Sequence, residues 1–393
     1  MYHCRLINRS EEFVLLEEKW NSLLSNSSSN NFFLRWEWLW NWWEVFETGD
    51  MELCILLIEK EKGKVVGIAP FYLLRRLLGG IYPVKRLMFL GTQTEGPGSI
   101  GSEYMNIICR EGEEESIAQY LFDQIVSHNF CDEIYLSKMD TSSIAFNLFK
   151  KLAARERFLS MVFNESKSPY ISLHSTWEEH LNGLSASMRY KIRNERRKLE
   201  KSTGNVVIRN TCDEIKLSSD FQEFMRLHQT RWLSRNMGGA FSSVKFTLFH
   251  KKVVSSLMKS GYLDLIFLSV DGKNKAAMYN IIYNNKVYFY LSGLDTNGGK
   301  GSFGLLLHGY CIEEAIKRGM DEYDFMLKGK LDGYKDQWTK DHRVLADLYI
   351  TKHGITKQYM RARAVVRSCY HRVKPFIILS SVMQRKKGSE GLT

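Results

Sequence analysis

The chain of 393 residues contains an internal repeat, and this feature most limits what it can fold into. In the N-terminal half, Leu53–Leu74 read as two apolar strands joined by a charged turn at Lys62-Gly63. In the C-terminal half, Leu263–Tyr283 repeat the arrangement around Asp271-Gly272, a dipeptide typical of tight hairpin turns. A repeated strand–turn–strand unit predicts a duplicated domain.

The elements that follow each hairpin also keep the same order. A third strand ends in glycine, at Leu87–Gly91 and again at Val287–Gly293. An amphipathic helix then leads into a short strand, and we predict these helices over Glu113–His128 and Gly304–Arg318. Antiparallel strands joined to a helical crossover form a mixed sheet, so the sequence predicts an α/β fold.

Other helices are predicted outside the repeat from their apolar spacing. They cover Glu11–Leu24, Trp36–Phe46, Trp177–Lys201, Phe221–Trp232 and Val244–Met258. We place the domain boundary near Asn164–Tyr170, which gives an N-terminal domain over residues 1–165 and a C-terminal domain over residues 166–347. Residues 348–393 are expected to form a basic amphipathic tail.

Charge is concentrated in that tail. Between Leu348 and Ser389 there are ten basic residues and no Asp or Glu, which accounts for nearly all of the net charge of +11. Apolar residues such as those of Phe376–Leu379 are interspersed, so the tail has the character of a segment that lies on an anionic membrane surface. Binding to a protein partner is the other interpretation.

The remaining composition excludes several classes. Seven scattered cysteines without a CxxC pair predict reduced thiols and neither a metal site nor a cysteine nucleophile. No signal peptide and no stretch long enough to span a bilayer is recognisable. We therefore expect a cytoplasmic protein, either free or peripheral on the inner face of the membrane.

Several short motifs are spread over most of the chain. They include Trp36-Glu37-Trp38, Gly67-Ile68-Ala69-Pro70, Ser102-Glu103-Tyr104, Arg189-Tyr190, His228-Gln229-Thr230-Arg231-Trp232, Tyr290-Leu291-Ser292-Gly293 and Tyr334-Lys335 with Trp338. Together these motifs resemble the GNAT superfamily of acyl-CoA N-acyltransferases. More narrowly, the pattern resembles the CelD/BcsL-type acetyltransferases of cellulose biosynthesis, a tandem GNAT group related to the FemAB aminoacyltransferases. The resemblance implies two tandem GNAT-like mixed-sheet domains, the C-terminal one catalytic, and acyl-CoA as the donor.

The donor site is predicted in the glycine-rich segment 297–304, between a strand and a helix. Converging backbone N–H groups and a helix N-terminus favour a phosphate there, and the resemblance implies CoA pyrophosphate. The resemblance also places the polarisation of the carbonyl at Ser292-Gly293-Leu294. The family pattern is incomplete, because Gly298 and Phe303 replace its usual residues, which leaves the donor's identity open. The predicted donor-binding residues are Ser292, Gly293, Lys300, Gly301, Ser302 and Gly304.

Acyl transfer also needs groups that move a proton and hold the acceptor. The candidates for proton transfer are Glu103, His228, Tyr290 and Lys335, of which Glu103 follows the glycine-rich segment Gly91–Gly101. Candidates for binding the acceptor or an anionic ligand are Arg189, Tyr190, Arg231, Trp232, Tyr334 and Trp338.

Three functions are consistent with this sequence. The first is an acyltransferase that uses acetyl-CoA, a longer acyl-CoA or an acyl carrier to modify an amine or hydroxyl of an envelope polysaccharide or lipid precursor. The second is a FemAB-like aminoacyltransferase that uses charged tRNA, which the basic segment Arg189–Lys201 favours. The third is a membrane-associated binding protein with a decayed site. Small-molecule, lipid or sugar acceptors are the expected partners, and DNA is not.

Overall fold

The computed structural model describes residues 1–92, 100–173, 176–201, 204–296, 302–329 and 332–352, with Gly354 and Gln358. The N-terminal half contains β1 (His3–Ile7), α1 (Ser10–Val14), α2 (Glu17–Ser25), α3 (Trp36–Phe46), β2 (Met51–Lys60), β3 (Lys64–Leu78), β4 (Tyr82–Phe89), β5 (Ile108–Cys109), α4 (Glu114–Ser127), β6 (Glu133–Asp140) and α5 (Ile144–Arg155). Strand β7 (Leu159–Ser172) follows.

The C-terminal half repeats this succession with two additional helices at its start. It contains α6 (Trp177–Gly183), α7 (Ala186–Glu200), β8 (Val206–Asn210), α8 (Glu214–Leu233), α9 (Val244–Lys259), β9 (Leu263–Val270), β10 (Lys273–Tyr283), β11 (Lys286–Leu294), α10 (Phe303–Lys317), β12 (Glu322–Asp324) and β13 (His342–Thr351). The predicted α/β class is confirmed. The hairpin at Asp271-Gly272 has positive φ at both turn residues (50° and 74°), as a tight hairpin turn requires.

The strands of the described residues form one sheet, whereas two separate sheets were expected. Its order is β1-β2-β3-β4-β6-β13-β7-β12-β11-β10-β9-β8, with β5 beside β3. Each half contributes four antiparallel strands, followed by a parallel strand reached through a helix, which is α4 in one half and α10 in the other. The order is therefore symmetric about the central pair β13–β7, as a duplication predicts.

Strands β7 and β13 join the two halves. Strand β7 pairs with β13 through most of its length and then with β12 of the C-terminal half. Strand β13, the last of the C-terminal half, lies between β6 and β7. Both predicted boundaries, at 165/166 and 347/348, fall inside these strands, because the chain crosses between the halves as continuous strand and not as a linker. The first residues of the predicted tail, 348–351, belong to β13. Whether the halves are independent domains stays a prediction.

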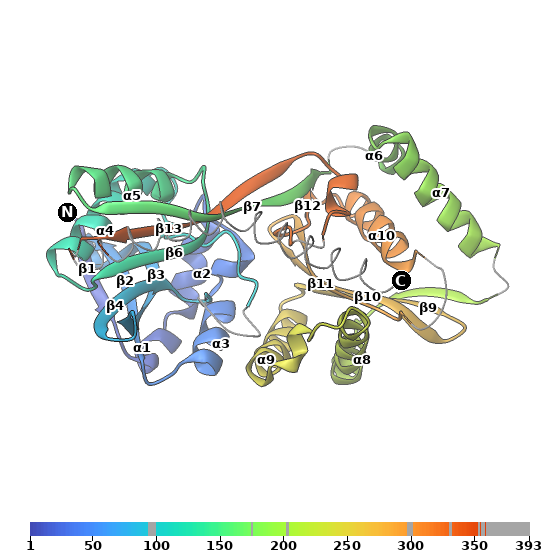
Figure 1. Cartoon of the computed structure of the whole chain (residues 1–393), viewed down its shortest axis with the longest axis horizontal. Helices are drawn as coiled ribbons and strands as arrows, with labels where there is room; N and C mark the ends of the chain where they lie inside the picture. Colours follow the sequence, from blue (N-terminus) through green and yellow to red (C-terminus); the bar gives the residue numbers. More distant parts are fainter. Residues whose placement is uncertain are drawn as a thin grey trace, which may run out of the picture.

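Helices cover both faces of the sheet, and the two halves face each other across a gap in the ribbon (Figure 1). In the C-terminal half, α8 and α9 lie on one face, and α10 and α7 lie on the other (Figure 1). Aromatic side chains fill the contact between the halves. The ring of Trp38 in α3 lies 4.8 Å from Phe249 in α9 and 5.6 Å from Tyr290 in β11, between ring centres.

Two of the predicted helices are interrupted. The expected helix Trp177–Lys201 is two helices, because Leu184 is extended and Ser185 accepts a hydrogen bond from Met188 N as the cap of α7. The expected helix Glu11–Leu24 is likewise divided into α1 and α2. Apolar spacing continues across both breaks, so periodicity alone did not reveal them. Helix α3 has the predicted bounds.

Candidate functional site

The candidate site lies where two neighbouring strands separate. Strand β11 pairs with β12 only along Lys286–Tyr288, and β11 then continues to Leu294 alongside β10. The pairing of β10 with β11 passes over Tyr290, so a bulge occurs at that residue and not at Ser292–Leu294, where the irregular strand was expected. Beyond the last paired residues, two cavities open.

The first, which we call the Glu103 cavity, has a volume of about 240 Å³. It brings together eight of the predicted residues from both halves of the chain. These are Glu103, His228, Arg231, Trp232, Tyr290, Ser292, Tyr334 and Lys335.

The second, which we call the Met278 cavity, has a volume of about 200 Å³ and a largely apolar lining. It contains the predicted residues Arg231, Ser292, Gly293, Gly304, Tyr334 and Trp338. Three residues line both cavities, namely Arg231, Ser292 and Tyr334. The two spaces are therefore separated by one wall of side chains.

Glu103 is a buried carboxyl group with few neutralising partners. Its side chain is 5% exposed, and both of its oxygens accept from the backbone N–H of Leu327, at 2.9 and 2.8 Å. Burial, and next the negative charge of Asp324, raise the pKa of Glu103 to about 8. A carboxyl group with a pKa near neutral pH is suited to proton transfer.

Unusual backbone geometry holds this carboxyl group in place. Tyr104, which follows Glu103, has φ of 55°, and Met326, which precedes Leu327, has φ of 61°. Non-glycine residues in this region of φ carry a strain of roughly 1 kcal/mol or more, and such strain concentrates at functional sites. On the other side of Glu103, Ser102 accepts from Trp38 Nε1 at 2.8 Å and donates to Gly91 O at 2.7 Å.

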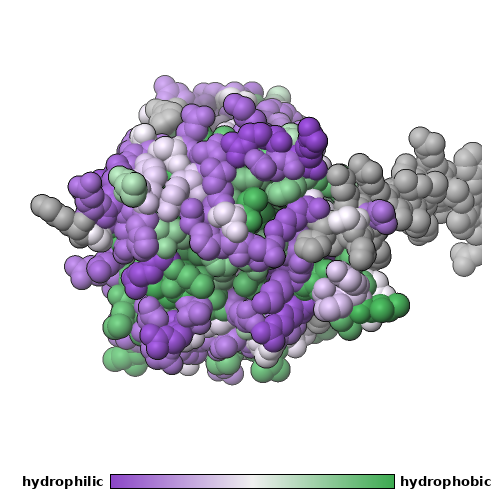
Figure 2. Space-filling view, turned by 90° about the vertical axis from the view of Figure 1, so that its left-hand side faces the viewer, coloured by the Kyte–Doolittle hydropathy of each residue, from purple (hydrophilic) through white to green (hydrophobic). Residues whose placement is uncertain are grey.

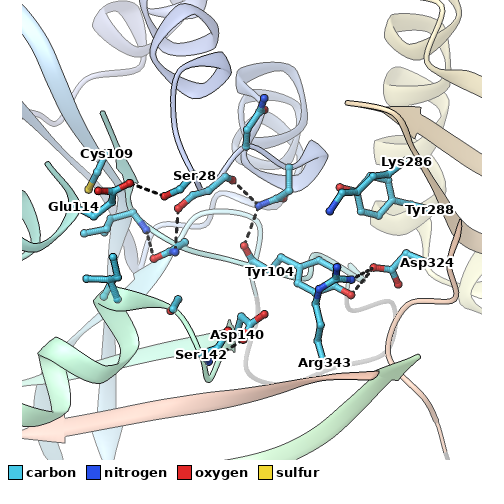
Figure 3. A pocket seen from close by; sticks show the side chains of 18 residues that line it. Ser28, Tyr104, Cys109, Glu114, Asp140, Ser142, Lys286, Tyr288, Asp324 and Arg343 are labelled. Carbon is cyan, nitrogen blue, oxygen red and sulfur yellow. Dashed lines mark hydrogen bonds and ion pairs between the residues drawn. The ribbon is translucent and has the colours of Figure 1, made fainter. Parts of the chain in front are cut away.

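A larger cavity of about 360 Å³ lies between the halves, behind Glu103. Figure 3 shows Tyr104 of one half beside Asp324 and Arg343 of the other. The hydroxyl of Tyr104 donates to Asp324 and lies 2.7 Å from Ser168 Oγ, which in turn lies 3.5 Å from Glu103 Oε2. A chain of hydrogen bonds therefore links Glu103 to this cavity. Sequence reasoning missed Ser168 and Asp324, because no motif marks them.

Lys335 is buried, with 4% of its surface exposed. Its Nζ donates to Leu327 O at 2.7 Å and Met326 O at 3.3 Å and lies 3.6 Å from the carboxylate of Asp332. Burial lowers the pKa of Lys335. The side chain thus fixes the segment that donates to Glu103, and its predicted part in proton transfer stays a prediction.

His228 does not have the geometry of a base. Its Nε2 accepts from Trp232 Nε1 at 3.0 Å, and its Nδ1 lies 3.4 Å from Gln229 Oε1. Burial lowers the pKa of His228 to about 4, so the ring is neutral and both nitrogens are engaged. His250, which the sequence analysis did not single out, is buried as well, and its pKa is lowered to about 3.

Tyr290 remains a candidate proton donor. Its hydroxyl accepts from Gly101 N at 3.3 Å and lies 3.4 Å from His250 Nε2. Burial raises the pKa of Tyr290, so the phenol keeps its proton at neutral pH.

Arg231 crosses the wall between the cavities. Its guanidinium donates to Ser292 Oγ, and burial lowers its pKa. Its Nε is buried without a hydrogen-bond partner in the described part of the chain. Because buried donors are nearly always paired, this atom is suited to an incoming oxygen.

The predicted donor loop is described only in part. Lys300 and Gly301 lie outside the described residues, while Ser302 and Gly304 flank the start of α10. Ser302 N donates to Glu195 Oε2 of α7 at 3.4 Å, so a carboxylate already lies at this helix N-terminus.

Gly293 has a packing role in addition to lining the cavity. A Cβ there would lie 2.6 Å from both His228 N and Leu227 Cβ, so the glycine lets α8 approach β11 closely. The close approach is by a helix, whereas a ligand was expected. Arg189 and Tyr190 do not line either cavity, although Met188 and Lys191 on either side of them line the Met278 cavity. Arg189 donates to Asn182 O at 2.9 Å, and Tyr190 is 69% exposed.

Comparison with known proteins gives a family match for part of the chain. Residues 186–336 match the sequence family described as an acetyltransferase (GNAT) domain. No curated protein sequence matches the chain.

Solved structures give a likeness in fold. The crystal structure of FemX has 11% sequence identity and a TM-score of 0.58, with 91% of this chain and 99% of that chain covered. L-PGS from Bacillus licheniformis has 11% identity and a TM-score of 0.49, with 87% and 94% covered. A tandem GNAT protein from the clavulanic acid pathway has 10% identity and a TM-score of 0.43, with 88% and 98% covered. The last two scores are too low to support an argument. The chain thus has a mixed α/β fold of GNAT type, and its residues 186–336 match the acetyltransferase (GNAT) family.

Proposed function

We propose that the protein is an acyltransferase that moves an acyl group from a thioester donor, acyl-CoA or an acyl carrier, to an amine or hydroxyl. The observation that carries this proposal is the arrangement of the two cavities. An apolar cavity and a cavity with a buried carboxyl group of raised pKa meet at Arg231, Ser292 and Tyr334.

In this proposal the donor lies in the Met278 cavity. Met188, Met278 and Leu294 offer apolar contacts for the donor's arm, and the N-terminus of α10 lies nearby for its phosphates. The thioester carbonyl would then reach the wall, where Arg231 is available to stabilise its developing negative charge.

The acceptor lies in the Glu103 cavity. The ionised carboxylate of Glu103 takes the proton from the acceptor nitrogen or oxygen as the new acyl bond forms. The carbon–sulfur bond breaks, and the phenol of Tyr290 is placed to return a proton to the leaving thiolate. We infer from the sequence resemblance that the acceptor is a precursor of an envelope polysaccharide or lipid.

The test combines binding with turnover. We expect acetyl-CoA or a longer acyl-CoA to raise the unfolding temperature, since a ligand of the folded state stabilises it by mass action. With a panel of amines and hydroxyl compounds, release of the CoA thiol should be lost in Glu103→Gln and kept in Glu165→Gln, an exposed control. No stabilisation by any thioester donor would contradict the proposal.

A second candidate is aminoacyl transfer from charged tRNA. The exposed side chains of Lys191, Arg197 and Lys201 on α7 favour it, and Lys191 also lines the Met278 cavity. Stabilisation by aminoacyl-tRNA and not by acyl-CoA would select this function. A decayed binding protein would show neither form of turnover.

A further inference from the structure

The hairpin between β3 and β4 projects beyond the rest of the sheet. Strand β2 pairs with β3 only as far as Leu74, and β6 pairs with β4 only from Arg86 onward. Between these limits, Arg75–Leu78 pair with Tyr82–Lys85 as a two-stranded ladder, whose base is held by hydrogen bonds of Arg75 N to Asp50 O and of Asp132 N to Lys85 O. This two-stranded segment, residues 75–85, is called the finger below.

The tip of the finger is apolar and exposed. Ile81 is 86% exposed, Leu77 is 55% exposed and Tyr82 is 37% exposed, whereas Leu78 is buried. Single exposed apolar residues are common on proteins, but three within six residues at a projecting turn are not accounted for by folding. Figure 2 shows hydrophobic patches among hydrophilic side chains at this N-terminal end of the molecule.

Basic side chains surround the tip. A groove at the base of the finger is lined by Arg75, Arg76 and Lys85 together with the apolar Pro83 and Phe130. Glu52 pairs with Arg75 and Lys85, and the buried Glu133 pairs with Arg76. The three basic side chains Arg75, Arg76 and Lys85 outnumber these two glutamates, and the side chain of Arg75 is 60% exposed.

The last strand ends beside the same groove. Thr351 Oγ1 donates to Asp132 O at 3.1 Å, and the Nζ of Lys352 donates to Asn129, which lines the groove. The sequence after Lys352 carries nine further basic residues and no acidic one before Glu390.

We propose that the finger is a membrane contact, in which Leu77, Ile81 and Tyr82 insert at the interface of an anionic bilayer while Arg75, Arg76 and Lys85 face its headgroups. Insertion of apolar side chains and attraction of basic ones to the headgroups together give stable attachment where one alone is marginal. No helix in the described ranges is long and apolar enough to cross a membrane.

The experiment measures co-sedimentation of the full chain with vesicles rich in phosphatidylglycerol and with vesicles of phosphatidylcholine alone. The double variant Leu77→Ser/Ile81→Ser should bind the anionic vesicles about tenfold more weakly, because two apolar side chains no longer enter the interface. The control Ile215→Ser removes an isoleucine that is 90% exposed on α8, and it should bind as the unchanged protein does.

A variant that keeps or strengthens binding separates an effect on membrane insertion from damage to the fold. Ile81→Trp should bind the anionic vesicles at least as tightly as the unchanged protein, because tryptophan favours the membrane interface. Equal affinity of the double variant and the unchanged protein would overturn the proposal. So would self-association that depends on Ile81, since the tip would then be an interface between copies of this chain. The measurement needs no turnover, so it stands or falls separately from the acyltransferase proposal.

Discussion

At the scale of single residues, the proposed reaction depends on the ionisation of Glu103. A base acts only when its proton is absent, so the rate should rise with pH through about 8 and then level off. Glu103→Gln should lower kcat/KM by roughly 10² to 10⁴, the contribution expected of a positioned base. A pH–rate profile of both proteins checks this. A flat profile in the unchanged protein would exclude Glu103 as the base.

The neighbouring carboxylate of Asp324 offers a second test. Its negative charge is one cause of the raised pKa of Glu103, so Asp324→Asn should lower that pKa. The rising limb of the profile should then move to lower pH. Because Asp324 also accepts from Met326 N at 2.7 Å, the unfolding temperature must be followed in parallel. An unmoved midpoint in a folded variant would show that the two carboxyl groups do not interact.

How far the residues could be predicted depends on whether a motif marked them. Ser102-Glu103-Tyr104 and His228–Trp232 stand out in the sequence, and the structure brings both to one cavity. The roles of these residues could not be predicted from the sequence. His228 and Glu103 are both buried, but His228 is engaged by Trp232 and Gln229, while Glu103 faces Asp324 from the other half of the chain. Only the fold creates these neighbours.

At the scale of elements, the contact of α8 with β11 depends on Gly293. Gly293→Ala would place a methyl group 2.6 Å from His228 N, so either the helix or the strand must move. We expect the free energy of unfolding to fall by about 1–3 kcal/mol, as for overpacking of a core. Gly333→Ala, where a Cβ meets nothing within 4 Å, is the control. Chemical denaturation of both variants measures the difference, and equal stability would contradict this account.

The junction of α7 with α10 offers a test of donor binding. Glu195 lies at the N-terminus of α10, where it would repel donor phosphates. Glu195→Gln should therefore raise the affinity for acyl-CoA a few-fold in calorimetry. Glu200→Gln, at the exposed end of the same helix, should not change it. A loss of affinity in Glu195→Gln would instead assign that carboxylate to a binding role.

At the scale of the whole molecule, we predict that the two halves unfold together, because β13 links them. Because this strand pairs with both β6 and β7, truncation after Asp341 should expose the edges of two strands and unfold the N-terminal half as well. Truncation after Lys352 keeps β13 and should leave a single unfolding transition at a similar temperature. Calorimetry of the two truncations checks this. A stable N-terminal half without β13 would restore the idea of two independent domains.

The sequence by itself determined the duplication, the α/β class, the two hairpins and most helices, because these depend on local periodicity and turn chemistry. It also identified eight of the residues that line the Glu103 cavity and six of those that line the Met278 cavity. Only the tertiary structure decided that the sheet is continuous, since pairing of β13 with β6 joins residues about 210 positions apart in a register that no local pattern encodes. The same long-range contacts place Glu103 beside Asp324, while the tip of the finger extends past the last paired residues of β2 and β6. Ionisation and exposure depend on what surrounds a side chain, and here those surroundings come from the other half of the chain.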